Sequence, residues 1–517
     1  MNANPTPQAR PLQAAALLLA ATLAAGAAQP PGFTTAVQPY ALSLSPEYVL
    51  KPILSAGDQV PHSTDAAKQF KMIGVPDGLG AARLEGGIAL FMNHELAGTA
   101  ISEPVVGEPF YRGSLVSRLT LNHRGEVLSG SVAYNAVVDT ARGIELPPAR
   151  VDNTTPGFWR FCSATLAGSE EGFDRPIYLL GEENRSPSTF DGRGGLAVAV
   201  VDGKLHTLPH LGRFEHENLP VKRHTHNQTV LVLMEDNGVL FNSQLYLYVG
   251  RKDHRPGADP LARNGLTGGK LYVFASTTPG VANEADFQSG TIEGKWVELP
   301  DVSGLSDSEL ETLSQSVGAF GMTKSEDGAW SRRDENEFFF NSTGDGANAP
   351  AVVGNHFGRT YRLQFNEEDV TGPCLLSLLY NADKIYAAGG DIALTPDNID
   401  TSERYVMVCE DGTGFSRNAM AARGRTGLIW RYDLENNYAA TPIVTLATAG
   451  RDGRTVGSGI WETSGIINTE RLFGENSWIF DVQAHPPTAA PGANTVEDGQ
   501  LLLLLPADAE ESEVESD

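Results

Sequence analysis

The chain has few cysteines and few cations, and each shortage excludes a class of protein. Three cysteines in 517 residues, Cys162, Cys374 and Cys409, are too few for a disulfide framework. Their odd number leaves at least one thiol unpaired in the monomer. A Cys374–Cys409 disulfide is compatible with the sequence. The 38 lysines and arginines are outnumbered by 64 acidic residues, which gives a formal net charge of −26. Nucleic acid is therefore excluded as a partner, because binding it needs a basic surface.

Long hydrophobic runs are also lacking, apart from one at the start. Arg10 precedes an Ala/Leu-rich run over residues 12–23, and small residues follow at 25–28. This order predicts a secretory signal peptide over residues 1–28 and a periplasmic or extracellular protein. A membrane span needs roughly 20 strongly apolar residues, and no later stretch provides them. We therefore expect no integral membrane segment after signal removal.

Convincing helical patterns are few, whereas short apolar segments separated by turn residues recur along the chain. The sequence holds 55 glycines and 31 prolines, and segments such as 88–92, 230–234 and 405–409 predict strands. One short helix is predicted after Ser306, where Glu309 completes a capping box. We expect an all-β fold over residues 29–506: a single β-propeller of about six blades, with loop and short-helix insertions. Two β-sandwiches are the alternative. The acidic tail, residues 507–517, is predicted to be disordered.

Carboxylates follow several of these apolar segments directly. The polar triplets lie at residues 93–95, 182–184, 235–237, 410–412 and 483–485. Innermost strands of a propeller run in the same direction, so their ends converge on one mouth of the channel. Carboxylates gathered there repel one another unless they are protonated or neutralised, and calcium accepts several oxygen ligands. Any single triplet is better explained as a solvated turn, but the repeated pattern favours metal binding.

Standard motifs do not assign the chemistry. The sequence has no D-x-D-x-D-G calcium loop, no H-E-x-x-H zinc helix and no G-x-S-x-G nucleophile turn. A further calcium site from residues 396–398 with Glu410 and Asp411 is one hypothesis. Glu462, Ser464 and residues 483–485 are candidates for lining the channel.

An ordered set of motifs resembles the PhoX-type alkaline phosphatases, a family of secreted calcium- and iron-dependent β-propellers. The matching stretches are residues 74–80, 93–95, Cys162 followed by 182–184, 212–217 and 326–330. The chain is identified on these stretches as a divergent member of that family.

The resemblance implies a secreted, monomeric phosphatase that hydrolyses small-molecule phosphate monoesters at a centre of ferric and calcium ions. It implies a metal-held oxygen nucleophile, with Lys324 and Glu326 as catalytic residues. The implied metal ligands are Glu95, Cys162, Glu217 and Glu326, with one or both of Glu182 and Glu183. Further metal candidates are Asp327 and, from their place after an apolar run, Glu410 and Asp411. A thiolate with carboxylates suits iron, and carboxylates alone suit calcium.

The chain departs from the family at several points. Lys324 stands where the family has an arginine, and a lysine supplies a point charge rather than a bidentate fork. The residues around Cys162 lack the usual Gly-Gly pattern, and Arg10 is not part of a twin-arginine signal. Two other functions therefore stay open: a non-catalytic, calcium-stabilised propeller that binds a partner, and a propeller lactonase or esterase.

Overall fold

A computed structural model describes Met1 and residues 31–84, 86–347, 349–412, 417–486, 490–492 and 494–508. The predicted signal peptide, apart from Met1, and residues 509–517 of the acidic tail lie outside the described residues. The strands belong to the unit formed by Gly32–Asp517.

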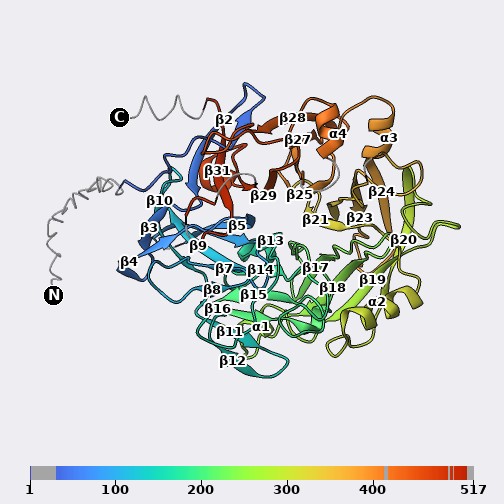
Figure 1. Cartoon of the computed structure of the whole chain (residues 1–517). Coiled ribbons are helices and arrows are strands. Elements are labelled where there is room, and N and C mark those ends of the chain that lie inside the picture. The colour runs from blue at the N-terminus through green and yellow to red at the C-terminus, as the bar shows by residue number, and fades with distance from the viewer. Residues whose placement is uncertain are drawn as a thin grey trace. The chain divides into compact units, whose positions relative to one another are not determined.

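Strands dominate the described residues and pair into five main sheets, which form six blades (Figure 1). The first sheet holds, from its inner edge outward, β5 (Pro76–Leu84), β6 (Gly87–His94), β9 (Leu115–Leu121), β10 (Val127–Val132), β3 (Gln59–His62) and β4 (Asp65–Lys71). The second holds β13 (Ala164–Ala167), β14 (Ile177–Gly181), β15 (Ala197–Val201), β16 (Lys204–Thr207), β11 (Ala136–Asp139) and β12 (Ile144–Leu146).

The third and fourth blades share one eight-stranded sheet, because their outer strands β20 and β24 pair with each other. Blade 3 contains β17 (Gln228–Met234), β18 (Leu245–Arg251), β19 (Lys270–Ser276) and β20 (Gly290–Glu298). Its inner edge is the segment 216–222, which bridges Leu231 of β17 and Glu235 directly after it. Blade 4 contains β21 (Ser325–Trp330), β22 (Glu337–Ser342), β23 (Arg359–Gln364) and β24 (Cys374–Asn381).

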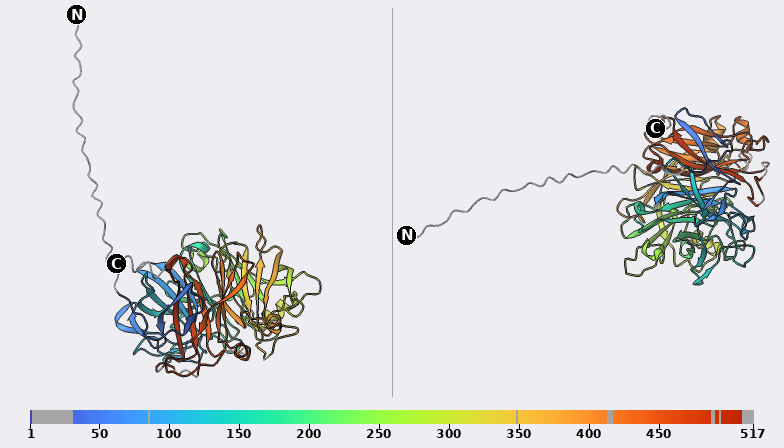
Figure 2. Two further views of the ribbon diagram at one scale, coloured as in Figure 1. Left: turned by 90° about the horizontal axis from the view of Figure 1, so that it is seen from above. Right: turned by 90° about the vertical axis from the view of Figure 1, so that its left-hand side faces the viewer.

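The last two blades complete the ring with strands from both ends of the chain. Blade 5 contains β25 (Pro396–Thr401), β26 (Tyr405–Glu410), β27 (Leu428–Asp433), β28 (Ala439–Leu446) and β1 (Ala41–Ser43). Blade 6 contains β29 (Glu462–Asn468), β30 (Trp478–Ala484), β31 (Asp498–Pro506) and β2 (Tyr48–Ser55). The blue strand β2 therefore lies among the red ones (Figures 1 and 2). The predicted propeller of about six blades is confirmed.

Helices are short and lie in the connections between strands. They are α1 (Pro260–Arg263), α2 (Asp307–Ser316), α3 (Ala382–Ala387), α4 (Arg417–Ala422) and α5 (Glu470–Phe473), with 3-10 turns η1 (Ser169–Glu171) and η2 (Pro209–Leu211) and a small hairpin of β7 (Ile101–Ser102) and β8 (Tyr111–Arg112). The capping box predicted at Ser306 and Glu309 opens α2. None of the helices among the described residues is long and apolar enough to span a membrane. All three cysteines are buried free thiols, so no Cys374–Cys409 disulfide forms.

The hydrophobic core lies between the blades. Six buried clusters each fill one junction between neighbouring blades, including the junction between the sixth blade and the first. The second strand of a blade packs on both faces, so β14, β26 and β30 are buried along their whole length. This explains why second strands read as continuous apolar runs in the sequence.

The innermost strands have a different composition because they line the central channel. β5, β21, β25 and β29 carry Gly, Asp, Glu, Asn or Ser among few large apolar residues. Each begins, rather than ends, at the mouth where the second strands finish, since each innermost strand pairs antiparallel with the second strand. The sequence-based expectation that innermost strands end at this mouth is therefore wrong: the carboxylate-bearing ends belong to second strands.

The β2–β31 pairing closes the ring, and its removal should open it. A chain that begins at Gly57 lacks β2 and exposes the edge of β31 with its apolar run of five leucines, Leu501 to Leu505. Exposed apolar edges aggregate. We expect aggregation or a melting temperature lower by at least about 10 °C, measured by scanning calorimetry. The control is a chain that begins at Gly32 and keeps β2; equal melting temperatures of the two chains would contradict the closure.

Candidate metal centre

The mouth of the channel is built from one structural unit that recurs in the blades. In blade 1, Val75 turns the chain into β5, Asp77 lies two residues further on, and Glu95 follows β6. The amide of Glu95 donates to the carbonyl of Val75 at 2.9 Å, which closes the hairpin at the mouth. We name these three places the turn position, the inner position and the return position.

The same backbone hydrogen bond recurs in the next four blades. The return amide donates to the turn carbonyl at 2.9–3.1 Å in the pairs Glu183–Arg160, Asp236–Glu215, Thr343–Lys324 and Asp411–Thr395. In each blade the inner position lies two residues after the turn position. The inner residues are Asp77, Cys162, Glu217, Glu326 and Asp397, and in blade 6 the corresponding sequence position is that of Glu462.

Inner and return side chains meet in a pocket of about 460 Å³ at the mouth. Its lining includes four inner residues, Cys162, Glu326, Asp397 and Glu462, and five residues that follow second strands, Glu95, Glu183, Asp236, Asp411 and His485. Two cations at turn positions, Arg160 and Lys324, line it as well. The mouth is therefore rich in carboxylates, as the strand-end pattern predicted.

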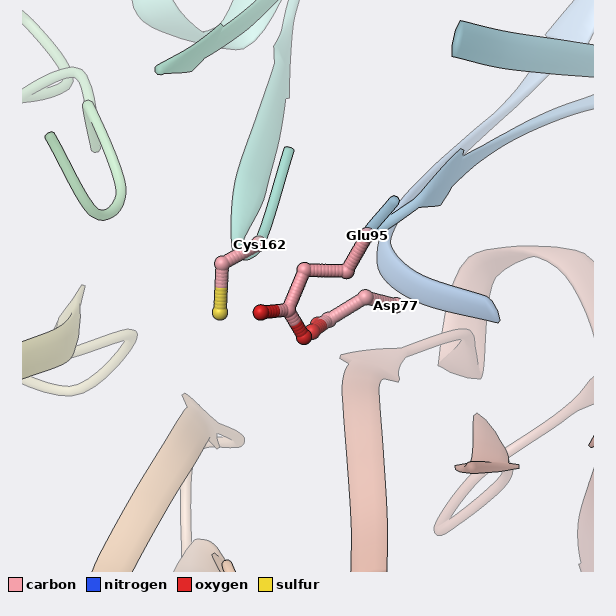
Figure 3. Close-up of side chains that lie close together, drawn as sticks. All are labelled: Asp77, Glu95 and Cys162. Carbon is pink, nitrogen blue, oxygen red and sulfur yellow. The ribbon is translucent and has the colours of Figure 1, made fainter. Parts of the chain in front are cut away.

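Three overlapping groups of side chains could hold metal ions. In the first, atoms of Asp77, Glu95 and Cys162 lie within 4.8 Å of one another, and these side chains point toward one another (Figure 3). The second consists of Cys162, Glu217 and Asp397, and the third of Glu183, Glu217 and Asp236. Because Cys162 and Glu217 are each shared, the seven residues form one connected set, which we call the ligand cluster.

Neighbouring residues hold the side chains of the first group, Asp77, Glu95 and Cys162, in place. The carboxyls of Asp77 and Glu95 both accept hydrogen bonds of 2.9 Å from Gln483 Nε2. Asn93 Nδ2 donates to the carbonyl of Cys162 at 2.7 Å. Gly78 must lack a side chain here, because a Cβ would lie 2.4 Å from that carbonyl oxygen.

The cluster has the donor atoms of a cation site and lacks the partners that would otherwise satisfy them. Among the described residues, both carboxylate oxygens of Glu217, Oδ1 of Asp236 and Oδ1 of Asp397 are buried without a hydrogen-bond partner. Buried polar groups are normally paired, so these oxygens need a cation, a proton or water. The carboxylates fit hard cations such as calcium, and the Cys162 thiol fits iron.

Burial and mutual repulsion oppose ionisation of the cluster. Burial, helped by the neighbouring Glu95, raises the pKa of Asp77 to about 8, and burial beside Asp236 raises that of Glu326 to about 8. The pKa values of Glu183, Glu217 and Asp397 are also raised, through burial first; nearby carboxylates add to the rise, and Arg160 opposes it at Glu183. Burial also raises the pKa of the Cys162 thiol.

Not every residue predicted for the site from the sequence reaches the pocket. Glu95, Cys162, Glu183, Lys324, Glu326 and Asp411 line it, and Glu217 belongs to the ligand cluster. Glu182 instead accepts backbone hydrogen bonds from Trp159 and Phe190, and Glu410 forms an ion pair with Arg425. Asp327 accepts from Asn218 Nδ2 at 2.6 Å.

Alternation along the strands explains these three differences. Successive side chains of a strand point to opposite faces. Glu182 and Glu410 directly precede return residues, and Asp327 directly follows the inner residue Glu326, so each points away from the pocket.

Arg160 carries no recognisable signal in the sequence, and Asp77, Asp236 and Asp397 are visible there only as members of longer motifs. A usable signal was present for Asp77 and Asp397, since Pro76-Asp77-Gly78 and Pro396-Asp397-Asn398 begin equivalent strands of two blades.

Comparison with known proteins agrees with this architecture. The family profile "Alkaline phosphatase PhoX" matches residues 202–456, a segment that contains Glu217, Lys324, Glu326 and Asp397. The structure is similar to Pseudomonas fluorescens PhoX in complex with vanadate, a transition state analogue, with a TM-score of 0.64, 16% identity, and coverage of 92% of this chain and 98% of that one. The resemblance to the PhoX family is confirmed.

Other comparisons are weaker. An α-L-arabinofuranosidase from Fusarium graminearum has a TM-score of 0.41 and 8% identity, with coverage of 88% of this chain and 98% of that one. No curated protein matches the chain.

Metal-free protein should lose stability as the pH rises. The pKa values of Asp77 and Glu326 rise from 3.8 and 4.5 to about 8 on folding. A carboxyl whose pKa is higher in the folded protein does not change the free energy of unfolding at a pH below its unfolded pKa. Between the unfolded and the folded pKa this free energy falls progressively, and above about pH 8 the loss is complete. In EDTA we expect the melting temperature to fall by roughly 5 °C or more between pH 5 and pH 8.5. Calcium and ferric ions should abolish this fall; a metal-free melting temperature that is flat or rises with pH would contradict it.

Proposed function

We propose that the protein is a periplasmic or extracellular phosphatase that hydrolyses phosphate monoesters at a centre of iron and calcium ions. The observation that carries the proposal is the ligand cluster: seven side chains from four blades, connected through Cys162 and Glu217. The match to the PhoX profile supports phosphate-ester chemistry at this site.

The donor types support a division of the metals within the cluster. Cys162 belongs to the first and second groups, whereas the third, Glu183, Glu217 and Asp236, offers only carboxylates. Iron is therefore proposed next to Cys162, and calcium at the third group. When bound, such ions supply positive charge to phosphate oxygens and lower the pKa of water.

The protein's own groups have complementary roles. Lys324 Nζ lies 3.3 Å from Asp236 and from Glu326, so the ammonium is held at the edge of the third metal group. There it can bind a phosphate oxygen while it neutralises two carboxylates. His485 Nδ1 lies 2.6 Å from Glu497 and lines the same pocket, where an imidazole can accept or donate a proton at the leaving oxygen.

Metal analysis combined with substrate tests distinguishes this function from the others. Protein exported by a bacterial host should contain both iron and calcium and cleave p-nitrophenyl phosphate, and chelation should abolish cleavage. Calcium without iron and without phosphatase activity would favour a calcium-stabilised binding protein. Cleavage of p-nitrophenyl acetate or a lactone, independent of iron, would favour an esterase.

Neighbouring glutamates provide a matched pair of variants. Glu183 lies in the ligand cluster, whereas the adjacent Glu182 bonds to backbone amides. Glu183→Gln should lower metal content per chain and reduce kcat/KM for p-nitrophenyl phosphate by about 100-fold, because ligand-sphere changes have effects of this order.

Glu182→Gln is the control, since it changes a buried carboxyl without touching the cluster. It should lower the melting temperature but retain metal content per folded chain. Equal metal loss in both variants would show that the assignment of Glu183 rather than Glu182 is mistaken.

A further inference from the structure

Arg160 occupies in blade 2 the place that Lys324 occupies in blade 4. Each lies two residues before an inner residue, Cys162 or Glu326, and the carbonyl of each accepts the return amide of its own blade. Both have positive φ values, 36° for Arg160 and 55° for Lys324. Such backbone is uncommon for residues with side chains and recurs at functional sites.

The two cations flank the same pair of carboxylates. Arg160 Nη2 lies 2.8 Å from Glu183 Oε1, and its Nε donates to the Glu183 carbonyl at 2.9 Å. Lys324 Nζ lies 3.3 Å from Asp236. Since Glu183 and Asp236 belong to one ligand group, positive charge stands on both sides of the third group.

Both cations face the open part of the pocket. Their side chains are 38% and 28% exposed, against 4% for Glu183 and 6% for Asp236. The contacts found for Arg160 among the described residues engage Nε and Nη2. The remaining nitrogen, Nη1, can therefore bind an incoming oxyanion while the ion pair with Glu183 is kept.

We propose that Arg160 is a second phosphate-binding residue, which together with Lys324 contacts the non-bridging oxygens of the phosphate group. The inference rests on the proposed function, because that function makes a phosphate ester the substrate. A guanidinium offers directional N–H donors that an ammonium lacks. Arg160 thus supplies, from another blade, the planar donor group that is missing at Lys324.

A purely structural role for Arg160 makes a different prediction. If Arg160 only holds Glu183, its loss should release metal, and phosphate binding should weaken only as far as metal is lost. If Arg160 contacts phosphate, binding should weaken at unchanged metal content. Direct binding therefore separates the two roles without relying on turnover.

The experiment measures calorimetric binding of inorganic phosphate to metal-loaded protein, together with metal content per chain. We expect Kd to rise about tenfold in Arg160→Lys and further in Arg160→Gln, with metal content unchanged. The matched control is Arg185, which is 39% exposed and paired with Glu215 and Glu311 but absent from the pocket lining. Arg185→Lys and Arg185→Gln should stay within twofold of wild type.

Three results would overturn the proposal. They are an unchanged Kd in Arg160→Gln, a higher Kd that appears only with metal loss, and a wild-type protein that binds no phosphate. If Arg160→Gln does not fold, the Kd of Arg160→Lys decides. Phosphate binding without cleavage of p-nitrophenyl phosphate by the wild type would remove the proposed function, while the role of Arg160 would still be decided by Kd.

Discussion

One backbone hydrogen bond, from the return amide to the turn carbonyl, determines the geometry of the mouth. It is formed in five blades at 2.9–3.1 Å. Each bond fixes where the first strand begins and where the second ends, so the inner and return side chains must project into the same space. The pocket, its charge and the two cations at turn positions all follow from this repeated constraint.

The constraint concentrates more negative charge than the fold can hold unaided. Side chains of Glu183, Glu217 and Asp236 lie within 4.8 Å of one another in a buried place, where desolvation and repulsion both disfavour ionisation. Arg160 and Lys324 neutralise part of this charge, and protons or metal ions must neutralise the rest. A cation that binds here should therefore stabilise the folded protein, because it offsets repulsion that the fold itself creates.

Many short strands without an alternating βα pattern predicted a propeller of about six blades, and the carboxylates that follow apolar runs predicted its acidic mouth. The sequence could not show which strand of each blade faces the channel, since innermost strands carry no apolar run. At three places the sequence named two adjacent carboxylates and could not choose between them, because run boundaries do not reveal which face a side chain takes; only Glu183, Glu326 and Asp411 line the pocket. The sequence could not identify Arg160 as a site residue. Its equivalence to Lys324 depends on the backbone hydrogen bond that each carbonyl accepts, which the residue type does not reveal.

The central claim is that the ligand cluster binds iron beside Cys162 and calcium among the carboxylates. Anomalous diffraction from crystals of the metal-loaded protein tests it most directly, with data collected on both sides of the iron absorption edge. The account predicts an iron peak adjacent to Cys162 Sγ and Glu217, and a non-iron cation between Glu183 and Asp236. Water alone at both places, in crystals of protein that retains phosphatase activity, would contradict it.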